Sequence, residues 1–151
     1  MPAIPNPNPL TLGVANSLWV TRLDLTNSNL VAILNPWDGQ YIVANASATR
    51  KLILPLTDPA TAAVADALRS NLATLSGQSG KLLFASITSN DTSTAMVFAN
   101  YDTGQTKTIN GKTVPVTAPY RIQNLFTVMA SNSAIATLFS DVMTFLAGKV
   151  V

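Results

Sequence analysis

The sequence predicts an α+β domain in which antiparallel β-hairpins pack against two helical segments. Three observations lead to this fold class. Several short runs carry apolar residues at every second position, as half-buried strands do. Two longer stretches carry them at helical spacing, and Asn, Asp and Gly clusters separate the runs. A chain of 151 residues suits one domain. We expect this domain at residues 18–151, after an extended Pro-rich arm at residues 1–17.

Proline dominates the start of the chain, which reads Met-Pro-Ala-Ile-Pro-Asn-Pro-Asn-Pro-Leu. Proline fixes φ, lacks an N–H donor and pushes the preceding residue into extended conformations. The segment therefore predicts an extended, polyproline-like arm. We expect such an arm to lie along a neighbouring subunit, and the alternatives are that it lies along the body of its own chain or is an unattached terminus. The arm residues expected to contact a partner are Pro2, Ile4, Pro5, Pro7, Pro9 and Leu10.

The first strands follow the arm. Leu18–Thr26 alternates, with Trp19, Leu23 and Leu25 expected on one buried face. A turn at residues 27–29 precedes a short apolar strand at 30–35. The turn Asn-Pro-Trp-Asp-Gly at 35–39 then leads to further strands at 40–44 and 49–54.

A helix is expected to begin after Asp58, a good N-cap residue, because Pro59 suits the first helical position. Gly77 is expected to end this helix as its C-cap residue. Between them, apolar residues recur at helical spacing: Val64, Leu68, Leu72 and Leu75. A strand at 82–88 completes the first half of the chain.

The second half contains the strongest hairpin signal, Asn110-Gly111, between strands at 106–109 and 112–116. Pro115 makes the second of these an edge strand. A strand at 94–99 and a turn at 100–105 are expected before the hairpin. Helices at 121–130 and 133–147 follow it, with a short terminal strand at 150–151. Because this order resembles that of the first half, residues 18–88 and 89–151 fit an internal duplication. Coincidental recurrence of turn residues remains the alternative.

The chain contains no His and no Cys, and all seven of its acidic residues are Asp. Most catalytic acids, bases, nucleophiles and metal ligands come from the missing residue types. We therefore expect a protein that is not an enzyme and has no cofactor and no metal site.

One enzymatic alternative remains, at Asp102-Thr103-Gly104. This triplet resembles the active-site triplet of aspartic proteases, in which two carboxylates share a proton. One triplet per chain implies a homodimeric hydrolase. The flanking residues depart from that family, because Asn100-Tyr101 replaces an apolar pair and Gln105 replaces a small residue. A turn is the competing interpretation.

Charged residues make up only 11% of the chain, and the net charge is +2. The basic residues are scattered, so nothing indicates a nucleic-acid site, and no stretch is long and apolar enough to indicate a membrane span. A surface so poor in charge suits an assembly subunit that contacts copies of itself, although a neutral Thr-rich β surface explains it as well. The aromatic residues Trp37 and Tyr101 lie in expected turns and are predicted contact residues, unless each folds over its own hairpin.

Together, the Pro-rich arm at 1–10 and the Ala-, Thr-, Asn- and Ser-rich hairpin body resemble a tailed-bacteriophage virion protein of the capsid decoration, or cement, type. That resemblance implies a non-catalytic subunit that stabilises the shell and contacts a neighbouring structural protein, the major capsid protein. No signal-peptide pattern is visible, so synthesis in the host cytoplasm and a place in the virion are expected. The alternatives are a neck or tail ring subunit and a soluble binding module of unknown ligand.

Overall fold

The computed structural model describes residues 11–12, 18–37, 42, 49–89 and 93–150, and the structural statements below concern these residues. The predicted contact residues of the arm at positions 2–10 lie outside them, as do Asp38 and Gly39 of the expected turn at 35–39. Most of the expected strand at 40–44 also lies outside the described residues.

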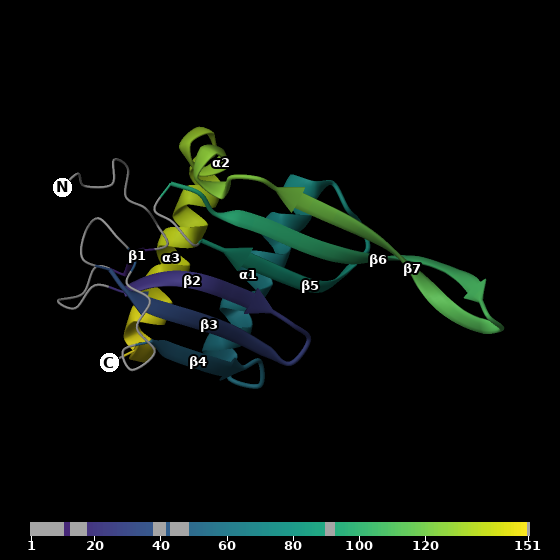
Figure 1. Ribbon diagram of the computed structural model, residues 1–151, viewed down its shortest axis with the longest axis horizontal. Coiled ribbons are helices and arrows are strands. Elements are labelled where there is room, and N and C mark those ends of the chain that lie inside the picture. The colour runs from purple at the N-terminus through teal and green to yellow at the C-terminus, as the bar shows by residue number, and fades with distance from the viewer. Residues whose placement is uncertain (1–10, 13–17, 38–41, 43–48, 90–92, 151) are drawn as a thin grey trace.

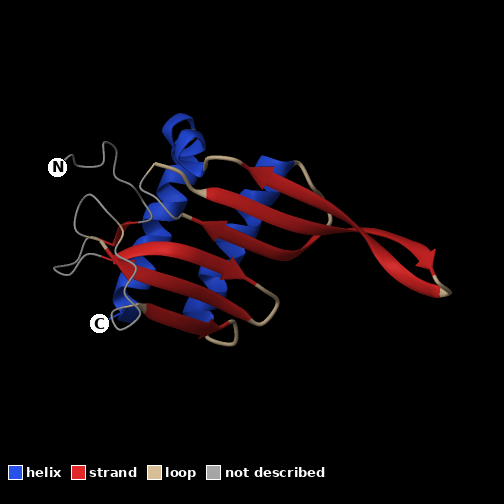
Figure 2. Ribbon diagram, viewed as in Figure 1, coloured by secondary structure: helices blue, strands red, loops and turns tan. Residues whose placement is uncertain are grey.

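The described residues form one antiparallel sheet with helices packed on one of its faces (Figures 1 and 2). This confirms the predicted α+β class. The strand order is β4-β3-β2-β5-β6-β7, and a short β1 pairs with β2 beside this path. The strands are β1 (Thr11–Leu12), β2 (Leu18–Leu25), β3 (Asn29–Pro36), β4 (Arg50–Pro55), β5 (Lys81–Thr88), β6 (Met96–Ile109) and β7 (Lys112–Ile122). The helices are α1 (Pro59–Ser76), α2 (Leu125–Ser131) and α3 (Ser133–Val150).

Strand β1 corrects part of the predicted arm. Thr11 and Leu12 lie within residues 1–17, yet they pair with Trp19 and Leu18 of the same chain. These two residues are therefore paired with this chain's own sheet, and the contact of the rest of the arm with a neighbouring subunit stays a prediction.

Helix α1 forms as the sequence predicts, because its ends carry the expected caps. The side chain of Asp58 accepts hydrogen bonds from the backbone N–H and the hydroxyl of Thr61, at 3.1 and 2.9 Å. Gly77 ends the helix with φ +68° and donates its N–H to the Ala73 carbonyl. Leu68 and Leu72 of the predicted stripe are buried against the sheet.

A register shift in β2 changes the predicted face of Trp19. The shift lies between Val20 and Arg22, so Val20 pairs with Leu34 while Arg22 pairs with Ile33. Leu18 and Val20 therefore face the helices together with Leu23 and Leu25. Trp19 is fully buried, as expected, but on the opposite side of the sheet from Leu23.

Of the two predicted C-terminal helices, the first begins later than predicted, whereas the second begins at Ser133 as predicted and ends later. Arg121 and Ile122 belong to β7 and not to the expected helix at 121–130, which begins as α2 after the N-cap residue Asn124. Val150 belongs to α3, so the expected terminal strand at 150–151 is wrong at that residue. The common origin of residues 18–88 and 89–151 stays a prediction.

The hairpin β6–β7 forms as predicted, with Asn110 at φ 50° and Gly111 at φ 77°, the positive values that a two-residue turn of this kind needs. β7 is an edge strand, which accommodates Pro115. The expected turn at 100–105 is wrong, because these residues lie inside β6, where a register shift between Asp102 and Thr106 replaces a turn.

Candidate protein-contact surfaces

The hairpin extends well beyond the rest of the sheet as a two-stranded ribbon, defined here as residues 103–116 (Figure 1). Almost every residue of the ribbon is exposed. Cross-strand pairing places Lys107 opposite Val114 and Ile109 opposite Lys112, so these four side chains share one face. The other face carries Thr106, Thr108, Thr113 and Pro115. The ribbon therefore has a basic, apolar face and a threonine face.

The base of the ribbon is held by local hydrogen bonds around Asp102. The Asp102 carboxylate accepts from the backbone N–H of Gly104 at 2.9 Å, and the Thr103 hydroxyl donates to the Val116 carbonyl at 2.8 Å. Gly104 has φ +82°, which favours glycine. Asp102-Thr103-Gly104 is thus the bulge from which the ribbon departs. The aspartic hydrolase stays an untested alternative, and it would have to use a carboxylate that is bonded within this bulge.

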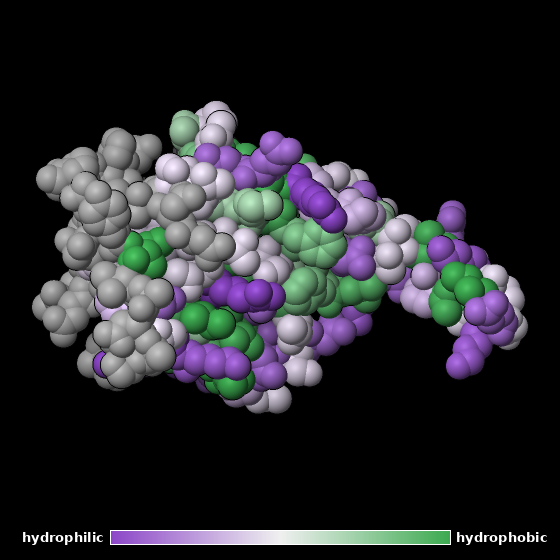
Figure 3. Space-filling model, in the orientation of Figure 1, coloured by the Kyte–Doolittle hydropathy of each residue, from purple (hydrophilic) through white to green (hydrophobic). Residues whose placement is uncertain are grey.

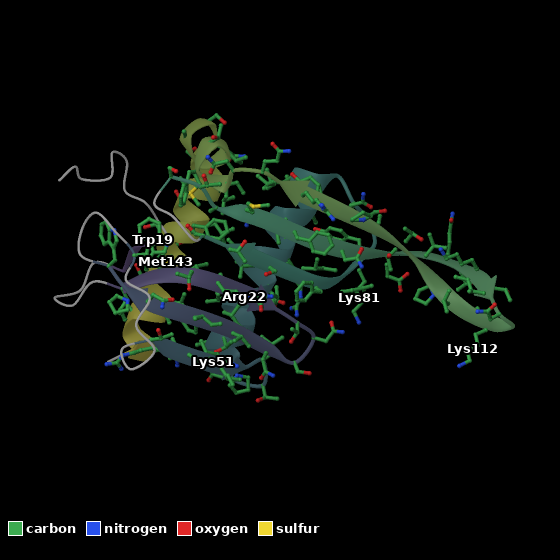
Figure 4. All side chains as sticks on the ribbon, viewed as in Figure 1. Trp19, Arg22, Lys51, Lys81, Lys112 and Met143 are labelled. Carbon is green, nitrogen blue, oxygen red and sulfur yellow. The ribbon has the colours of Figure 1, made fainter. Side chains whose placement is uncertain are left out.

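The sheet face opposite the helices is the second surface, called here the open face (Figures 3 and 4). Strand pairing orders its side chains into two rows. One row runs from β4 to β7 as Ile53, Val31, Asp24, Ser86, Phe98 and Arg121. The other runs from β4 to β6 as Lys51, Ile33, Arg22, Thr88 and Met96. Ile53 and Met96 are large apolar side chains of this face that are 57% and 56% exposed.

A polar cluster occupies the middle of the open face. Asp24 accepts from the Arg22 side chain at 2.8 Å and from the Ser86 hydroxyl at 2.5 Å. The positive charge of Arg22 is therefore balanced by the Asp24 carboxylate within the sheet. At the edge of the face, the Arg121 guanidinium lies 5.1 Å from the centre of the Phe98 ring, and the Phe84 and Phe98 rings lie 6.5 Å apart.

A hollow of about 480 Å³ opens on this face across β2, β5, β6 and β7. It is called here the β5–β7 hollow. Its lining combines apolar side chains with two arginines: Arg22, Phe84, Ser86, Thr88, Met96, Val97, Phe98, Arg121, Ile122 and Gln123.

The two predicted aromatic contact residues have different outcomes. Tyr101 lies in β6 with its side chain 1% exposed in the core between sheet and helices, so its predicted role as a surface contact is wrong. It was expected in a turn, where burial is unusual, but the bulge follows it. Burial raises the pKa of the neighbouring Tyr120, and Tyr101 adds to that rise.

Trp37 is half-buried, and its ring packs 5.4 Å from the Trp19 ring. Trp19 also meets Phe126 edge-on at 6.4 Å and donates its indole N–H to the Ser89 hydroxyl at 3.0 Å. Trp37 thus partly covers a second apolar cluster on the Trp19 side of the sheet. Its role as a partner contact stays a prediction.

Sequence reasoning did not find Phe84, Phe98 and Arg121 as surface residues. Phe98 alternates with the core residues Val97 and Ala99 of its strand, and that period-two signal was available. For Phe84 the signal was interrupted, because a register shift separates it from the core residue Leu82. Arg121 was assigned to a helix, so its place opposite Phe98 was not predicted.

Within the described ranges, no group of three or more Asp side chains is arranged to hold a metal ion. No single helix of the described chain is long and apolar enough to cross a membrane. Taken together, α2 and α3 have the length and apolar composition of a membrane span, but the two helices are bent by 120° relative to each other. Comparison with protein-family models, with curated proteins and with solved structures found no match to this chain.

Proposed function

We propose that this chain is a non-catalytic assembly protein that attaches to a larger protein structure through its ribbon. The setting that fits its sequence is a virus particle, in which it would be a capsid decoration subunit bound to the major capsid protein. The observation that carries the proposal is the ribbon itself, two strands that leave the sheet with neither face covered by another described element.

The ribbon adds little to the stability of its own domain. A two-stranded hairpin without a covering layer is marginally stable in water, and ordering each of its residues costs about 1–2 kcal/mol of conformational entropy. Its Ile109 side chain is 48% exposed and so buries little apolar surface. A segment with this cost and little internal gain is best explained by a contact with another molecule.

The ribbon is also suited to insertion between protein surfaces. The ribbon contains residues 103–109 of β6 and 112–116 of β7. Strands rise about 3.3 Å per residue, so five to seven residues give a reach of roughly 16–23 Å. Ile109 and Val114 supply apolar contact on one face, while Lys107 and Lys112 supply charge beside them. Such a mixture of anchor and charge is typical of interfaces that form after both partners have folded.

The test is co-sedimentation of the purified chain with capsids from the source of the sequence. The informative variant is Ile109→Thr with Val114→Thr, which makes the basic face fully polar but retains β-forming residues. The matched control is Thr108→Ser with Thr113→Ser on the threonine face. We expect the first variant to lose binding at least tenfold and the control to bind as the parent does.

Both double variants should unfold within about 0.5 kcal/mol of the parent, because the changed residues are mostly exposed. A parent chain that does not bind capsids overturns the decoration role. Closed rings formed by the chain alone, detected by mass in solution, would assign it instead to a neck or tail ring. Equal capsid binding by all three proteins contradicts the role of the ribbon.

A further inference from the structure

We propose that the β5–β7 hollow is a second docking site, which takes a partner-protein segment carrying a carboxylate beside a large apolar side chain. The Arg121 guanidinium would pair with the carboxylate, and the apolar side chain would enter the hollow. This inference rests on the proposed assembly function and adds to it the chemistry of a second contact, on a different surface from the ribbon.

Arg121 is the residue that defines the charge of the occupant. It is exposed on the edge strand β7, and its guanidinium is held over the Phe98 ring directly opposite it on β6. Within the described part of the chain it forms no ion pair, whereas Arg22 at the other rim is bound to Asp24. A planar guanidinium positioned on an aromatic ring presents its N–H donors in a fixed direction, which suits two-point binding of a carboxylate.

The hollow itself defines the apolar part of the occupant. Its volume of about 480 Å³ falls within the range of roughly 300–1,000 Å³ that is typical of small-molecule sites, so it has room for a large apolar side chain. Phe84, Phe98 and Met96 provide apolar lining. Methionine is a flexible, polarisable side chain that adapts to an incoming apolar group, and Met96 is 56% exposed.

The charge of the open face favours an acidic protein segment. Strand pairing puts Arg22, Lys51 and Arg121 on this face against the single carboxylate of Asp24 in the same two rows. Nucleic acid fits less well, because stable phosphate binding uses several cations along a track. Here one of the two arginines in the hollow is bound to Asp24, and the Phe98 ring that would stack on a base is already occupied by Arg121.

A second copy of this chain also fits less well. The large apolar side chains that are exposed in the described structure are Ile53, Met96 and Ile109. Two of them lie on the open face itself, and Ile109 has Lys112 beside it on the ribbon. Among the described residues, the exposed large apolar side chains thus lie beside cations or on the open face itself, which favours a segment of a different protein as the occupant.

The test is an NMR titration of the full chain labelled with ¹³C at its methionine methyl groups. Met96 lines the hollow, while Met129 and Met143 are buried in the core and serve as internal references. The probes are the blocked peptide Leu-Asp-Phe-Asp-Leu, its counterpart Leu-Asn-Phe-Asn-Leu without carboxylates, and a ten-nucleotide oligothymidylate. We expect the acidic peptide to shift the Met96 methyl signal and to leave those of Met129 and Met143 in place.

Two variants identify the charge that matters. Arg121→Gln should weaken binding of the acidic peptide about tenfold or more, because a charge-assisted hydrogen bond is lost. Lys51→Gln removes the same charge from the far side of the open face and should change binding less than twofold. Both are exposed, so both variants should fold; unchanged Met129 and Met143 signals verify this.

Several results would overturn the proposal: no Met96 shift at millimolar acidic peptide, equal binding of the two peptides, equal effects of the two variants, or tighter binding of the oligonucleotide. The ribbon variant Ile109→Thr with Val114→Thr should bind the acidic peptide as the parent does. If that variant loses capsid binding while the parent hollow binds no peptide, the assembly function stands and the hollow proposal fails. If the hollow binds the acidic peptide but the ribbon variant binds capsids as the parent does, the hollow proposal stands and the role of the ribbon fails.

Discussion

Replacing Gly80 with alanine should destabilise this protein markedly, although the residue has no unusual φ. Gly80 precedes β5 and lies against the β6 backbone at the base of the ribbon. A β-carbon at Gly80 would overlap the carbonyl oxygen of Asp102 and lie 2.9 Å from its carbonyl carbon. Because both of these atoms belong to the backbone, no side-chain rotation can remove the overlap.

The cost follows from what has to move. Overpacking against fixed neighbours costs about 1–3 kcal/mol, and here relief requires Lys81 to part from Asp102, its cross-strand partner. We therefore expect a loss of about 2–3 kcal/mol, or roughly 5–10 °C in Tm for a chain of this size. Gly148→Ala is the matched control, because a β-carbon there meets nothing within 4 Å and the residue is helical in α3. That change should stabilise by up to about 1 kcal/mol.

Urea unfolding followed by the fluorescence of Trp19 and Trp37 measures both free energies of unfolding. The m-value should be the same for the parent and both variants, since the surface exposed on unfolding is unchanged. If Gly80→Ala unfolds within about 0.5 kcal/mol of the parent, the close approach of Gly80 to the Asp102 backbone is not needed for stability, and the reasoning from overlap is wrong.

Three further predictions concern single side chains. Asp58→Asn keeps a cap acceptor for Thr61 but does not titrate. Hydrogen bonds from the Thr61 hydroxyl and then from its N–H lower the pKa of Asp58, so the parent should lose stability relative to this variant as the pH falls below the ordinary pKa of 3.8. Measuring the Tm of both proteins against pH checks this. Ser89→Ala leaves the buried Trp19 N–H without its acceptor and should cost about 1–3 kcal/mol in urea unfolding, whereas an unchanged midpoint would mean that the bond is dispensable. Tyr101→Phe removes a buried hydroxyl that has no partner among the described residues, so Tm should stay level or rise, and a clear fall would reveal a partner.

The elements that could be predicted from the sequence are those whose signals are local. Helix α1 begins after the N-cap residue Asp58, with a proline at its first position, and ends at Gly77. The hydrogen bonds of Asp58 and of Gly77 each join residues that are close together in the chain. Asn110-Gly111 likewise fixes its own turn through positive φ values. Neither signal depends on distant parts of the chain.

Register shifts account for most of the errors. A strand pattern assumes strict alternation, and one inserted residue reverses the faces on either side of it. The shift between Val20 and Arg22 moved Trp19 to the opposite face, and the shift after Asp102 made an apparent turn into the base of the ribbon. A bulge depends on pairing with a partner strand, which turn residues alone do not reveal.

The candidate site was predicted only in part for the same reason. Trp37 was chosen as an aromatic residue in a turn, which is a local property. The Arg121–Phe98 pair depends on β6 and β7 pairing in one particular register across 22 residues of intervening chain. The apolar residues after Arg121 have helical spacing, which predicted a helix there, but Arg121 belongs to β7 because this strand pairs with β6 up to Ile122.

Under the proposed function, the charges of the two candidate surfaces limit which partners they would contact. The ribbon carries Lys107 and Lys112 on its apolar face, and the open face carries Arg121 and Lys51 at its two edges. A ribbon from one copy laid on the open face of another would therefore bring like charges together, with only the already paired Asp24 in the two rows to offset them. Both surfaces instead complement acidic partners, and charges at the rim of a contact act mainly on the rate of association. If both surfaces contact one acidic protein lattice, capsid binding should slow as salt increases, because screening shortens the range of these charges to about 8 Å near physiological ionic strength.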